Sequence, residues 1–366
     1  MKLTIGTELM KDVMSRAIKG VGNNKLLPIT QMICVSLKDG VLTTITTDGT
    51  NYLYVKEQHV VGDDFYVVVD ANQFAKLISK MTSDNITMTV AEKTGALNVK
   101  GNGNYVLELP LDEDGEFIKF PDAYEKLMGS EFDEVVNINK STVQVILETV
   151  KPALATTFEN PEYTAYYVAD KVVATDRTTI ASMNIKFCDT PKLINADFLD
   201  LVSVMREEKI EARYCGNDVI FTTQDATIVG KLADGIDDFA IDAISEFIDQ
   251  EFTSFCSVPK TELLQMLDRL SLFVGPYDDN SVILTFANEG LQVSSKASSG
   301  VEIISYVASE KHVNFTASIN INMLIKTVKS ISSDVIEMFY GDDSAIKIVD
   351  GNITIVVALN DEDVNE

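Results

Sequence analysis

Residue types that usually build chemical sites are scarce in this chain of 366 residues. It has two histidines and four cysteines, and no C-x-x-C pair occurs among Cys34, Cys188, Cys215 and Cys256. Such spacing is not typical of a disulfide framework or a zinc site, and two isolated histidines do not suit Ser-His or Cys-His catalysis. We therefore predict a non-catalytic cytoplasmic protein that uses no metal and no cofactor.

Long apolar runs are also absent. No run approaches about 18 uncharged apolar residues, the length that a membrane-spanning helix needs. The first segment, MKLTIGTELMKDVM, carries charges inside an amphipathic pattern, unlike a secretory signal peptide. With an ordinary apolar content of 46%, the chain is expected to be globular and to have no membrane partner.

Basic residues are outnumbered, with 30 lysines and arginines against 56 acidic residues and a net charge of −26 at pH 7. Nonspecific DNA binding is mostly neutralisation of phosphates, so a chain this acidic is not expected to hold DNA over its whole surface. Any contact with DNA must use a local surface of opposite character.

What the sequence does contain is a strand–helix unit that occurs three times. In residues 67–81, VVVDANQFAKLISKM, β-branched residues lead into an apolar stripe at i, i+3, i+4 and i+7, with Lys76 and Lys80 off the stripe. The pattern returns in residues 193–205 and, more loosely, in residues 318–331. A unit that recurs about every 124 residues indicates a triplicated chain.

Each third of the chain follows the same predicted order of helix, β-meander, helix and β-meander. The first helix of each third is expected at 7–20, 140–151 and 259–272, with Thr7 as the first N-cap. Two helices on antiparallel sheet indicate an α+β architecture in three copies. We predict three domains over residues 1–123, 130–249 and 252–366, with an acidic tail over 361–366.

The six predicted helical segments are together slightly positive, although the chain is strongly acidic. One interpretation is that helix exteriors simply favour lysine, and the segment 195–209, predicted as one long helix, is itself acidic. The other is that the helices jointly line a surface that faces a polyanion. Lysines without interleaved aromatic residues suit loose, sequence-independent contact with duplex DNA better than stacking on single strands.

Several stretches resemble the bacterial DNA polymerase III β subunit, the sliding clamp. LLPIT at 26–30, SLKDGVLTTITTDGTN at 36–51 and the segment 67–81 are similar to its first domain. VVATDRTTIA at 172–181 resembles the family's V-A-T-D-G-H-R-L segment, and KLADGIDDF at 231–239 resembles K-L-V-D-G-R-F-P-D-Y. The likeness covers nearly the whole chain in order and suggests a divergent member, with a phage-encoded clamp as one interpretation.

The resemblance implies a closed ring of six similar domains, built from two three-domain subunits arranged head to tail as a homodimer. In this family the helices line the hole, duplex DNA threads it, and the ring tethers the replicative polymerase. The link is topological, so the polymerase meets DNA at a high effective concentration. The expected function is that of a replication processivity factor whose partners are double-stranded DNA, a DNA polymerase, a clamp loader and a second copy of the chain.

The basic residues expected near DNA lie in or beside the helical segments. A single one is more often a solvated lysine, so the expectation concerns the set. The set consists of Lys11, Arg16, Lys19, Lys25, Lys76, Lys80, Lys140, Arg206, Lys209, Lys260, Lys326 and Lys329.

The family binds short peptides of polymerases and loaders in a pocket between its second and third domains. By resemblance, that pocket consists here of Thr175, Arg177, Thr178, Thr179, Ile180, Asp238, Asp242, Ala243, Val356, Val357, Ala358 and Leu359. The match is partial, because the family's Gly-His-Arg is Arg177-Thr178-Thr179 and its Met-Pro-Met region is Ala358-Leu359-Asn360. A groove changed to this extent is expected to bind a different peptide.

The resemblance also implies a subunit contact between the end of the third domain's first helix and the outer edge strand of the first domain. Leu272 and Phe273 resemble the family's paired apolar interface residues, and Tyr105 is the candidate on the opposite side. The alternative is that these residues belong to an ordinary core.

Two other functions stay open at this point. One is a clamp-fold interaction hub that couples DNA to transcription or other partners. The other is an acidic, β-rich hydrolase, which requires a pocket with a perturbed pair of carboxylates.

Overall fold

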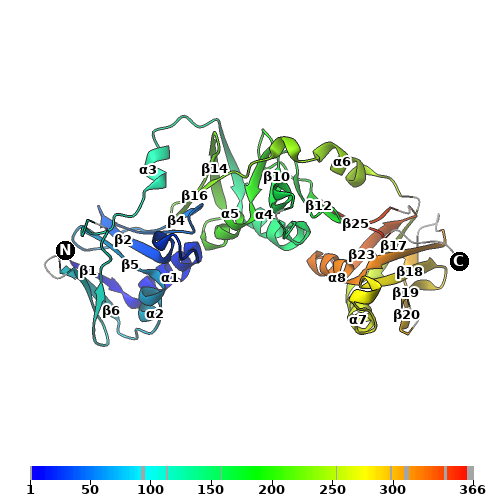
Figure 1. Ribbon diagram of the computed structural model, residues 1–366, viewed down its shortest axis with the longest axis horizontal. Helices are drawn as coiled ribbons and strands as arrows, with labels where there is room; N and C mark the ends of the chain where they lie inside the picture. Colours follow the sequence, from blue (N-terminus) through cyan, green and yellow to red (C-terminus); the bar gives the residue numbers. More distant parts are fainter. Residues whose placement is uncertain are drawn as a thin grey trace. The chain divides into compact units, whose positions relative to one another are not determined.

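The computed structural model describes residues 2–91, 95–112, 114–157, 159–252, 254–296, 299–308, 313–341 and 344–360. It contains three copies of one unit, strand–helix–three strands–strand–helix–three strands, which we call repeats 1, 2 and 3 (Figure 1). The triplication and the α+β class predicted from the sequence are confirmed, whereas the domain boundaries stay a prediction.

The elements follow one another in the same order in every repeat. Repeat 1 contains β1 (Lys2–Gly6), α1 (Thr7–Ala17), β2 (Met32–Lys38), β3 (Val41–Thr47), β4 (Tyr52–Glu57), β5 (Phe65–Asp70), α2 (Ala71–Ser79), β6 (Asn85–Ala91), β7 (Ala96–Lys100) and β8 (Asn104–Glu108). Repeat 2 contains β9 (Glu134–Asn139), α4 (Lys140–Val145), β10 (Ala165–Val168), β11 (Val172–Thr175), β12 (Thr179–Met183), β13 (Lys192–Asn195), α5 (Ala196–Asp200), β14 (Lys209–Cys215), β15 (Asp218–Thr222) and β16 (Ala226–Lys231).

Repeat 3 adds one short strand to this order. It contains β17 (Ser254–Pro259), α7 (Lys260–Leu270), β18 (Ser281–Ala287), β19 (Gly290–Ser295), β20 (Val301–Ile304), β21 (Val307–Ala308), β22 (Phe315–Asn320), α8 (Ile321–Ser330), β23 (Val335–Tyr340), β24 (Ala345–Asp350) and β25 (Ile353–Ala358). Two connector helices, which the sequence patterns did not reveal, are α3 (Ala123–Leu127) and α6 (Ile241–Asp249).

Each repeat builds two antiparallel sheets, and neighbouring repeats share a sheet. The sheet β5-β2-β3-β4 of repeat 1 continues through the β4–β16 pair into β16-β15-β14-β9 of repeat 2. In the same way, β13-β10-β11-β12 of repeat 2 continues through the β12–β25 pair into β25-β24-β23-β17 and β21 of repeat 3. The sheets β1-β6-β7-β8 and β20-β19-β18-β22 have no such extension among the described residues.

The chain divides into two compact units, one formed by residues 1–143 and 197–232 and the other by residues 144–196 and 233–366. Repeat 2 contributes to both units, because each of its sheets joins a sheet of a neighbouring repeat. The β4–β16 junction lies inside the first unit, and the β12–β25 junction lies inside the second.

The helices form because apolar residues recur at helical spacing, and these stripes face the sheets. Met10, Val13 and Met14 of α1 are buried, as are Phe74 and Ile78 of α2. The two helices pack against each other in the first unit, as α7 and α8 do in the second (Figure 1). Residues 67–81 thus form most of β5 and all of α2, and α2 packs against α1 in repeat 1.

Two local predictions were wrong. Thr7 is not an N-cap, because Gly6 takes that position and the Thr7 N–H donates to the Asp84 carbonyl at 3.0 Å as β1 runs directly into α1. The segment 195–209 is not one long helix, because α5 passes into a single 3₁₀ turn, η6 (Leu201–Val204), before β14 begins. Its basic residues therefore do not lie on a helix.

Candidate functional site

The predicted basic residues fall into an exposed group and an engaged group. On α2, Lys76 and Lys80 are exposed, and on α8 Lys326 and Lys329 are exposed. Lys329 lies 3.9 Å from an Asp268 carboxylate oxygen, a loose pair between exposed side chains. Exposed lysines also include Lys19, Lys25 and Lys209.

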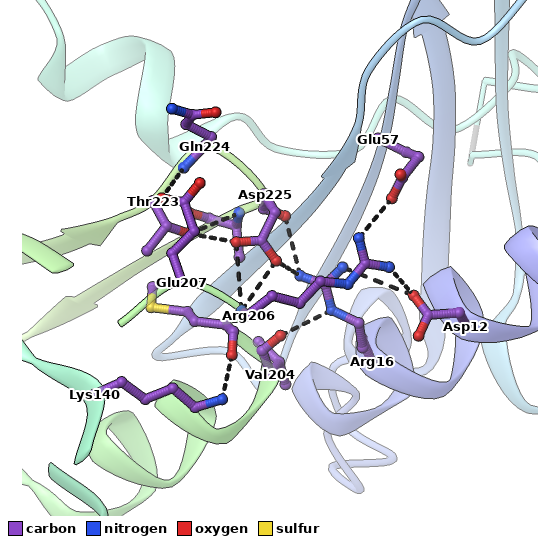
Figure 2. Close-up of polar contacts among 12 residues, drawn as sticks. Asp12, Arg16, Glu57, Lys140, Val204, Arg206, Glu207, Thr223, Gln224 and Asp225 are labelled. Atoms are coloured by element: carbon purple, nitrogen blue, oxygen red, sulfur yellow. Dashed lines mark hydrogen bonds and ion pairs between the residues drawn. The ribbon is translucent and has the colours of Figure 1, made fainter. Parts of the chain in front are cut away.

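Arg16 differs from this exposed group, because it is only 7% exposed and sits in a polar cluster of the first unit (Figure 2). Its guanidinium donates to the Asp225 carboxylate and, at 2.8 Å, to the Val204 carbonyl. Burial lowers the pKa of Arg16, while the neighbouring Asp225 carboxylate acts in the opposite direction. We therefore leave Arg16 out of the DNA-facing set proposed below.

Arg206 belongs to the same cluster. Its guanidinium donates to the Asp12 carboxylate and, at 3.2 Å, to a carboxylate oxygen of Glu57 (Figure 2). The cluster connects α1 and β4 of repeat 1 to the β15–β16 turn and the end of η6 in repeat 2. Arg206, which follows η6, bonds to one carboxylate on α1 and to another on β4. Lys11 is likewise paired within its own helix, with Glu8 at 2.8 Å.

Lys140 and Lys260 occupy the same position in two repeats, the first residue of α4 and of α7. The Lys140 ammonium donates to the Met205 carbonyl, and the Lys260 ammonium donates to the Ile331 carbonyl. Each of these carbonyls follows the second helix of its repeat, so both lysines cap that helix end, where unpaired carbonyls favour a cation. The two lysines thus serve the fold directly.

The predicted peptide pocket lies within the second unit, where the β11–β12 hairpin meets β25 and α6. The Ala358 N–H donates to the Thr178 carbonyl at 2.8 Å, and Thr179 and Ile180 lie opposite Val357 and Val356 across the β12–β25 pair. α6 packs against both strands. Of the remaining candidates, Asp238, Asp242 and Ala243 are exposed, and Leu359 follows β25 and is half-buried.

The hairpin at Thr175–Ile180 copies the one in repeat 1. The Thr175 hydroxyl donates to the Thr179 carbonyl at 2.8 Å, as the Thr47 hydroxyl does to the Asn51 carbonyl at 2.7 Å. Repeat 1 has a glycine at the left-handed position of this turn, whereas repeat 2 has Arg177 with φ 74°. A left-handed arginine costs about 1 kcal/mol of backbone strain.

The strained Arg177 lines a polar pocket of about 400 Å³ together with Thr178. The remaining lining residues, which sequence reasoning missed, come from Asp176 and from the 155–163 loop: Ala155, Thr157, Glu159, Asn160 and Tyr163. No local motif marked that loop, because its role depends on the long-range packing of repeat 2.

α6 is held over the outer face of this sheet at its middle and at its C-terminal end. The Lys347 ammonium donates to the Ile248 and Gln250 carbonyls, at 2.6 and 3.1 Å, and burial lowers the pKa of Lys347. The Lys171 ammonium donates to the Ser245 hydroxyl at 2.7 Å. The buried Ile244 side chain belongs to the apolar cluster of this face. The wall of the pocket is therefore built into the fold.

The predicted interface residues are exposed in the single chain. Leu272 and Phe273 form the turn η8 (Ser271–Phe273) after α7 and are 81% and 50% exposed. Tyr105 lies on β8, an edge strand, and is 38% exposed. Exposed apolar side chains at an edge suit a protein contact better than a core.

Other classes of site receive no support within the described ranges. No group of three His, Cys, Asp or Glu side chains there has a metal-binding arrangement. No helix among the described residues is long and apolar enough to cross a membrane.

Solved structures of bacterial sliding clamps are similar to this chain over nearly its whole length. The DNA polymerase sliding clamp of Bacillus subtilis is similar with a TM-score of 0.83 and 18% identity, over 99% of each chain. The β subunit of DNA polymerase III from Thermotoga maritima has a TM-score of 0.82 and 18% identity, over 99% of each chain. The Pseudomonas aeruginosa subunit has a TM-score of 0.84 and 15% identity, over 98% of this chain and 100% of that one. No family model and no curated protein matches the sequence.

Proposed function

We propose that the protein is a DNA sliding clamp: two copies join head to tail, the ring encloses duplex DNA, and a bound polymerase gains processivity. The chain has the sliding-clamp fold over its full length. The observation that carries the proposal beyond the fold is a pair of free sheet edges. They stand at the positions where the repeats join each other inside the chain.

The joining rule is the same at both internal junctions. The fourth strand of one repeat's outer sheet pairs with the last strand of the next repeat, as β4 pairs with β16 and β12 pairs with β25. By that rule, β20 of repeat 3 requires the last strand of a following repeat 1, which is β8. Both β20 and β8 are edge strands. A second copy of the chain supplies the missing partner on each side.

The internal junctions also predict the register of this contact. Equivalent positions follow from the residue before the second helix of each repeat, because Asp70, Asn195 and Asn320 lie opposite Met32, Ala165 and Ser281. Continued through the next two strand pairings, this register makes Tyr52, Ile180 and Ser299 equivalent. Their junction partners are Val229 for Tyr52 and Val356 for Ile180. The equivalent residue of β8, counted from the β7–β8 pairing, is Val106. We therefore expect Ser299, which lies just before β20 in one copy, to be opposite Val106 of the other copy, and Val301 to be opposite Asn104.

The helix ends give a second, independent indication. The turn after α1, η1 (Ile18–Gly20), packs against η6 of the next repeat. The turn η4 (Lys151–Ala153) packs against α8 of the next repeat in the same way. The equivalent turn of repeat 3 is η8, which carries the exposed Leu272 and Phe273. By repetition these two residues contact α2 of the following copy.

The exposed lysines of α2 and α8 are the proposed DNA-facing groups, with Lys19, Lys25 and Lys209 beside them. They suit a weak contact with phosphates that permits sliding, because no pocket fixes them and the rest of the surface is acidic. Lys11, Lys140, Arg206 and Lys260 are proposed to support the helix framework, since each has a protein partner.

The groove at Arg177 is proposed as the binding site for peptides of the polymerase and the loader. Glu159 and Asp176 line the pocket with Arg177, and the exposed Asp238 and Asp242 belong to the neighbouring candidate residues. Charge complementarity therefore favours a peptide with basic residues beside its apolar anchor. We propose further that the protein has no enzymatic activity of its own and works in the cytoplasm.

Single-particle imaging of the purified protein tests this function. A closed ring with six lobes and a central hole, with a mass of two chains, is the expected result. Open three-lobed particles in the presence of DNA would contradict head-to-tail closure. A clamp-fold hub remains the second candidate, and pull-down with the native partners separates it, since a hub retains its partners when no polymerase is present.

A further inference from the structure

A groove with a volume of about 920 Å³ lies in the first unit, on the outer face of the repeat 1 sheet. Its floor is formed by Val41, Thr43 and Ile45 of β3, and its wall by Phe120 and Tyr124 of the connector before repeat 2. It lies apart from the pocket at Arg177, which belongs to the other unit.

The groove exists because equivalent sheet faces are covered differently in the two repeats. In repeat 2, β10 and β11 have four residues each, and α6 lies over the face with Ile244 buried. In repeat 1, β2 and β3 have seven residues each, and the connector helix α3 buries none of its five residues. The longer hairpin of repeat 1 therefore extends the sheet face beyond α3, whose Ala123, Tyr124 and Leu127 pack on it but are only partly buried.

The connector is nevertheless anchored, so the groove has a fixed wall. The Phe120 N–H donates to the Tyr66 hydroxyl at 2.8 Å, and the Tyr124 N–H donates to the Tyr54 hydroxyl at 3.1 Å. The Tyr54 hydroxyl in turn donates to Asp122 at 3.0 Å, which engages that carboxylate. The aromatic wall is thus held by hydrogen bonds at both ends and does not need a ligand to form.

Three lysines give the groove a positive character on an acidic protein. The Lys56 ammonium donates to the Thr227 hydroxyl at 3.1 Å and lies 5.0 Å from the centre of the Tyr124 ring. Lys38 and Lys119 are exposed lining residues. Within the part of the chain that the structure describes, their side-chain ammonium groups have no hydrogen bond or ion pair. Against them stand the exposed Asp39 and the engaged Asp122.

An apolar pocket of about 320 Å³ shares Tyr66 with the groove and is lined by Val68, Leu109, Phe117 and Ile118, among others. A side chain the size of leucine or phenylalanine fits such a volume. The combination of an apolar pocket and neighbouring ammonium groups therefore selects a segment that carries both an apolar anchor and carboxylates.

We propose that this groove is a second docking site, which binds a short acidic segment of a protein partner. The segment places carboxylates on Lys38 and Lys119 and an apolar side chain against Phe120 or in the pocket beyond Tyr66. A nucleic acid is less suited, because the groove joins two exposed lysines to an apolar pocket and lacks the run of cations that phosphate binding needs. The site extends the proposed function but does not depend on it, since the groove lies within one unit of one chain.

Selection of peptides from a random 12-residue display library, with the full-length protein as bait, tests this site. We expect binders in which aspartate or glutamate flanks phenylalanine or leucine. Their affinity, measured by fluorescence polarisation, is expected to fall at least tenfold in the double variant Lys38→Glu, Lys119→Glu. Competition with a peptide that binds at Arg177 is expected to leave them bound.

The matched control is Lys2→Glu with Lys100→Glu, two exposed lysines of the same unit that lie outside the groove. Both double variants are expected to keep the wild-type melting temperature, because all four side chains are exposed. The proposal is overturned if no acidic binders emerge, or if those that emerge bind the Lys38→Glu, Lys119→Glu protein as tightly as the control. Because the readout is peptide binding to one chain, failure of ring closure does not affect it.

Discussion

One position of the repeat occurs in three environments, and the differences between them reveal a missing partner. Val229 of β16 and Val356 of β25 are each 3% exposed, because β4 and β12 lie beside them. The equivalent Val106 of β8 is 64% exposed. The same comparison at the preceding residue gives 0% for Ile228, 2% for Ile355 and 38% for Tyr105.

This contrast supports the proposal that a third junction, between two copies of the chain, is built like the other two with β8 as one of its strands. An edge strand with exposed apolar side chains promotes association unless charge or proline protects it. β8 and β20 carry Val106, Val301 and Ile303 at exposed positions. Substitutions at equivalent residues are therefore expected to lower the stability of the fold at the two internal junctions and to weaken the association of two copies at β8.

The largest effect is expected for Val229→Lys. An ammonium placed at a buried position without a partner should lower the free energy of unfolding by about 3 kcal/mol or more. Urea denaturation followed by circular dichroism measures this loss. A variant as stable as the wild type would remove the distinction between the internal and the open junctions.

Val106→Lys is expected to leave the fold intact and to break the assembly. The exposed edge accepts a lysine in the single chain, whereas a lysine at a position that is buried in both internal junctions should weaken association about 100-fold, or about 3 kcal/mol. Sedimentation velocity across a dilution series gives the dissociation constant. The control is Val135→Lys on the edge strand β9, where the side chain is 51% exposed and no contact is proposed. Equal effects of both substitutions would contradict the assignment of β8.

Leu272→Ala combined with Phe273→Ala addresses the helix-end contact. Loss of two anchoring side chains should cost about 2 to 4 kcal/mol of association and yield a soluble monomer. Light scattering after size-exclusion chromatography measures the mass. An unfolded product would instead return both residues to the core, which was the alternative that the sequence left open.

Lys76→Glu, Lys80→Glu, Lys326→Glu and Lys329→Glu together should weaken DNA contact without opening the ring. Each phosphate contact that is lost lowers the slope of log K against log salt by about 0.9. Lifetimes of labelled protein on surface-tethered DNA, recorded at several salt concentrations, give that slope. Lys140→Met with Lys260→Met is the contrasting pair, for which we expect lower stability and an unchanged slope.

The smallest effect is expected in the peptide groove. Asp238→Asn with Asp242→Asn should weaken a basic peptide about three- to tenfold, because both carboxylates are exposed and screened by salt. Fluorescence polarisation at low and physiological ionic strength measures the change. The proposed charge preference is wrong if the variant binds the peptide more tightly.

The sequence predicted the parts of the fold that depend on local periodicity. The stripe of Phe74, Leu77, Ile78 and Met81 identified α2, and its recurrence predicted three α+β repeats. It did not predict that neighbouring repeats share sheets, because the partners of β4 and β12 are far away in the chain and strand pairing leaves no local signal. The short connector helices were missed for a similar reason, since α6 is held by tertiary contacts such as that of Lys347.

The candidate residues were predicted less completely than the fold. Resemblance assigned Thr178 and Ala358 to one pocket, and the structure joins these two residues by a backbone hydrogen bond. Charge alone could not separate the exposed Lys76 from the buried Arg16, because burial of an arginine depends on a carboxylate more than 200 residues away, Asp225. The open groove at Lys38 and Lys119 had no sequence signal, since its lining residues come from four strands and a connector.

The central claim, topological linkage to DNA, is tested most directly by locking the ring chemically. Val106→Cys with Ser299→Cys places two thiols opposite each other in the predicted register, within reach of a disulfide. The reduced protein is mixed with nicked circular DNA, oxidised and washed at high salt, and the protein retained is measured before and after the DNA is cut once. We predict retention on the circle and release on cutting. Loss of the protein from the intact circle, with the disulfide formed, would contradict the account.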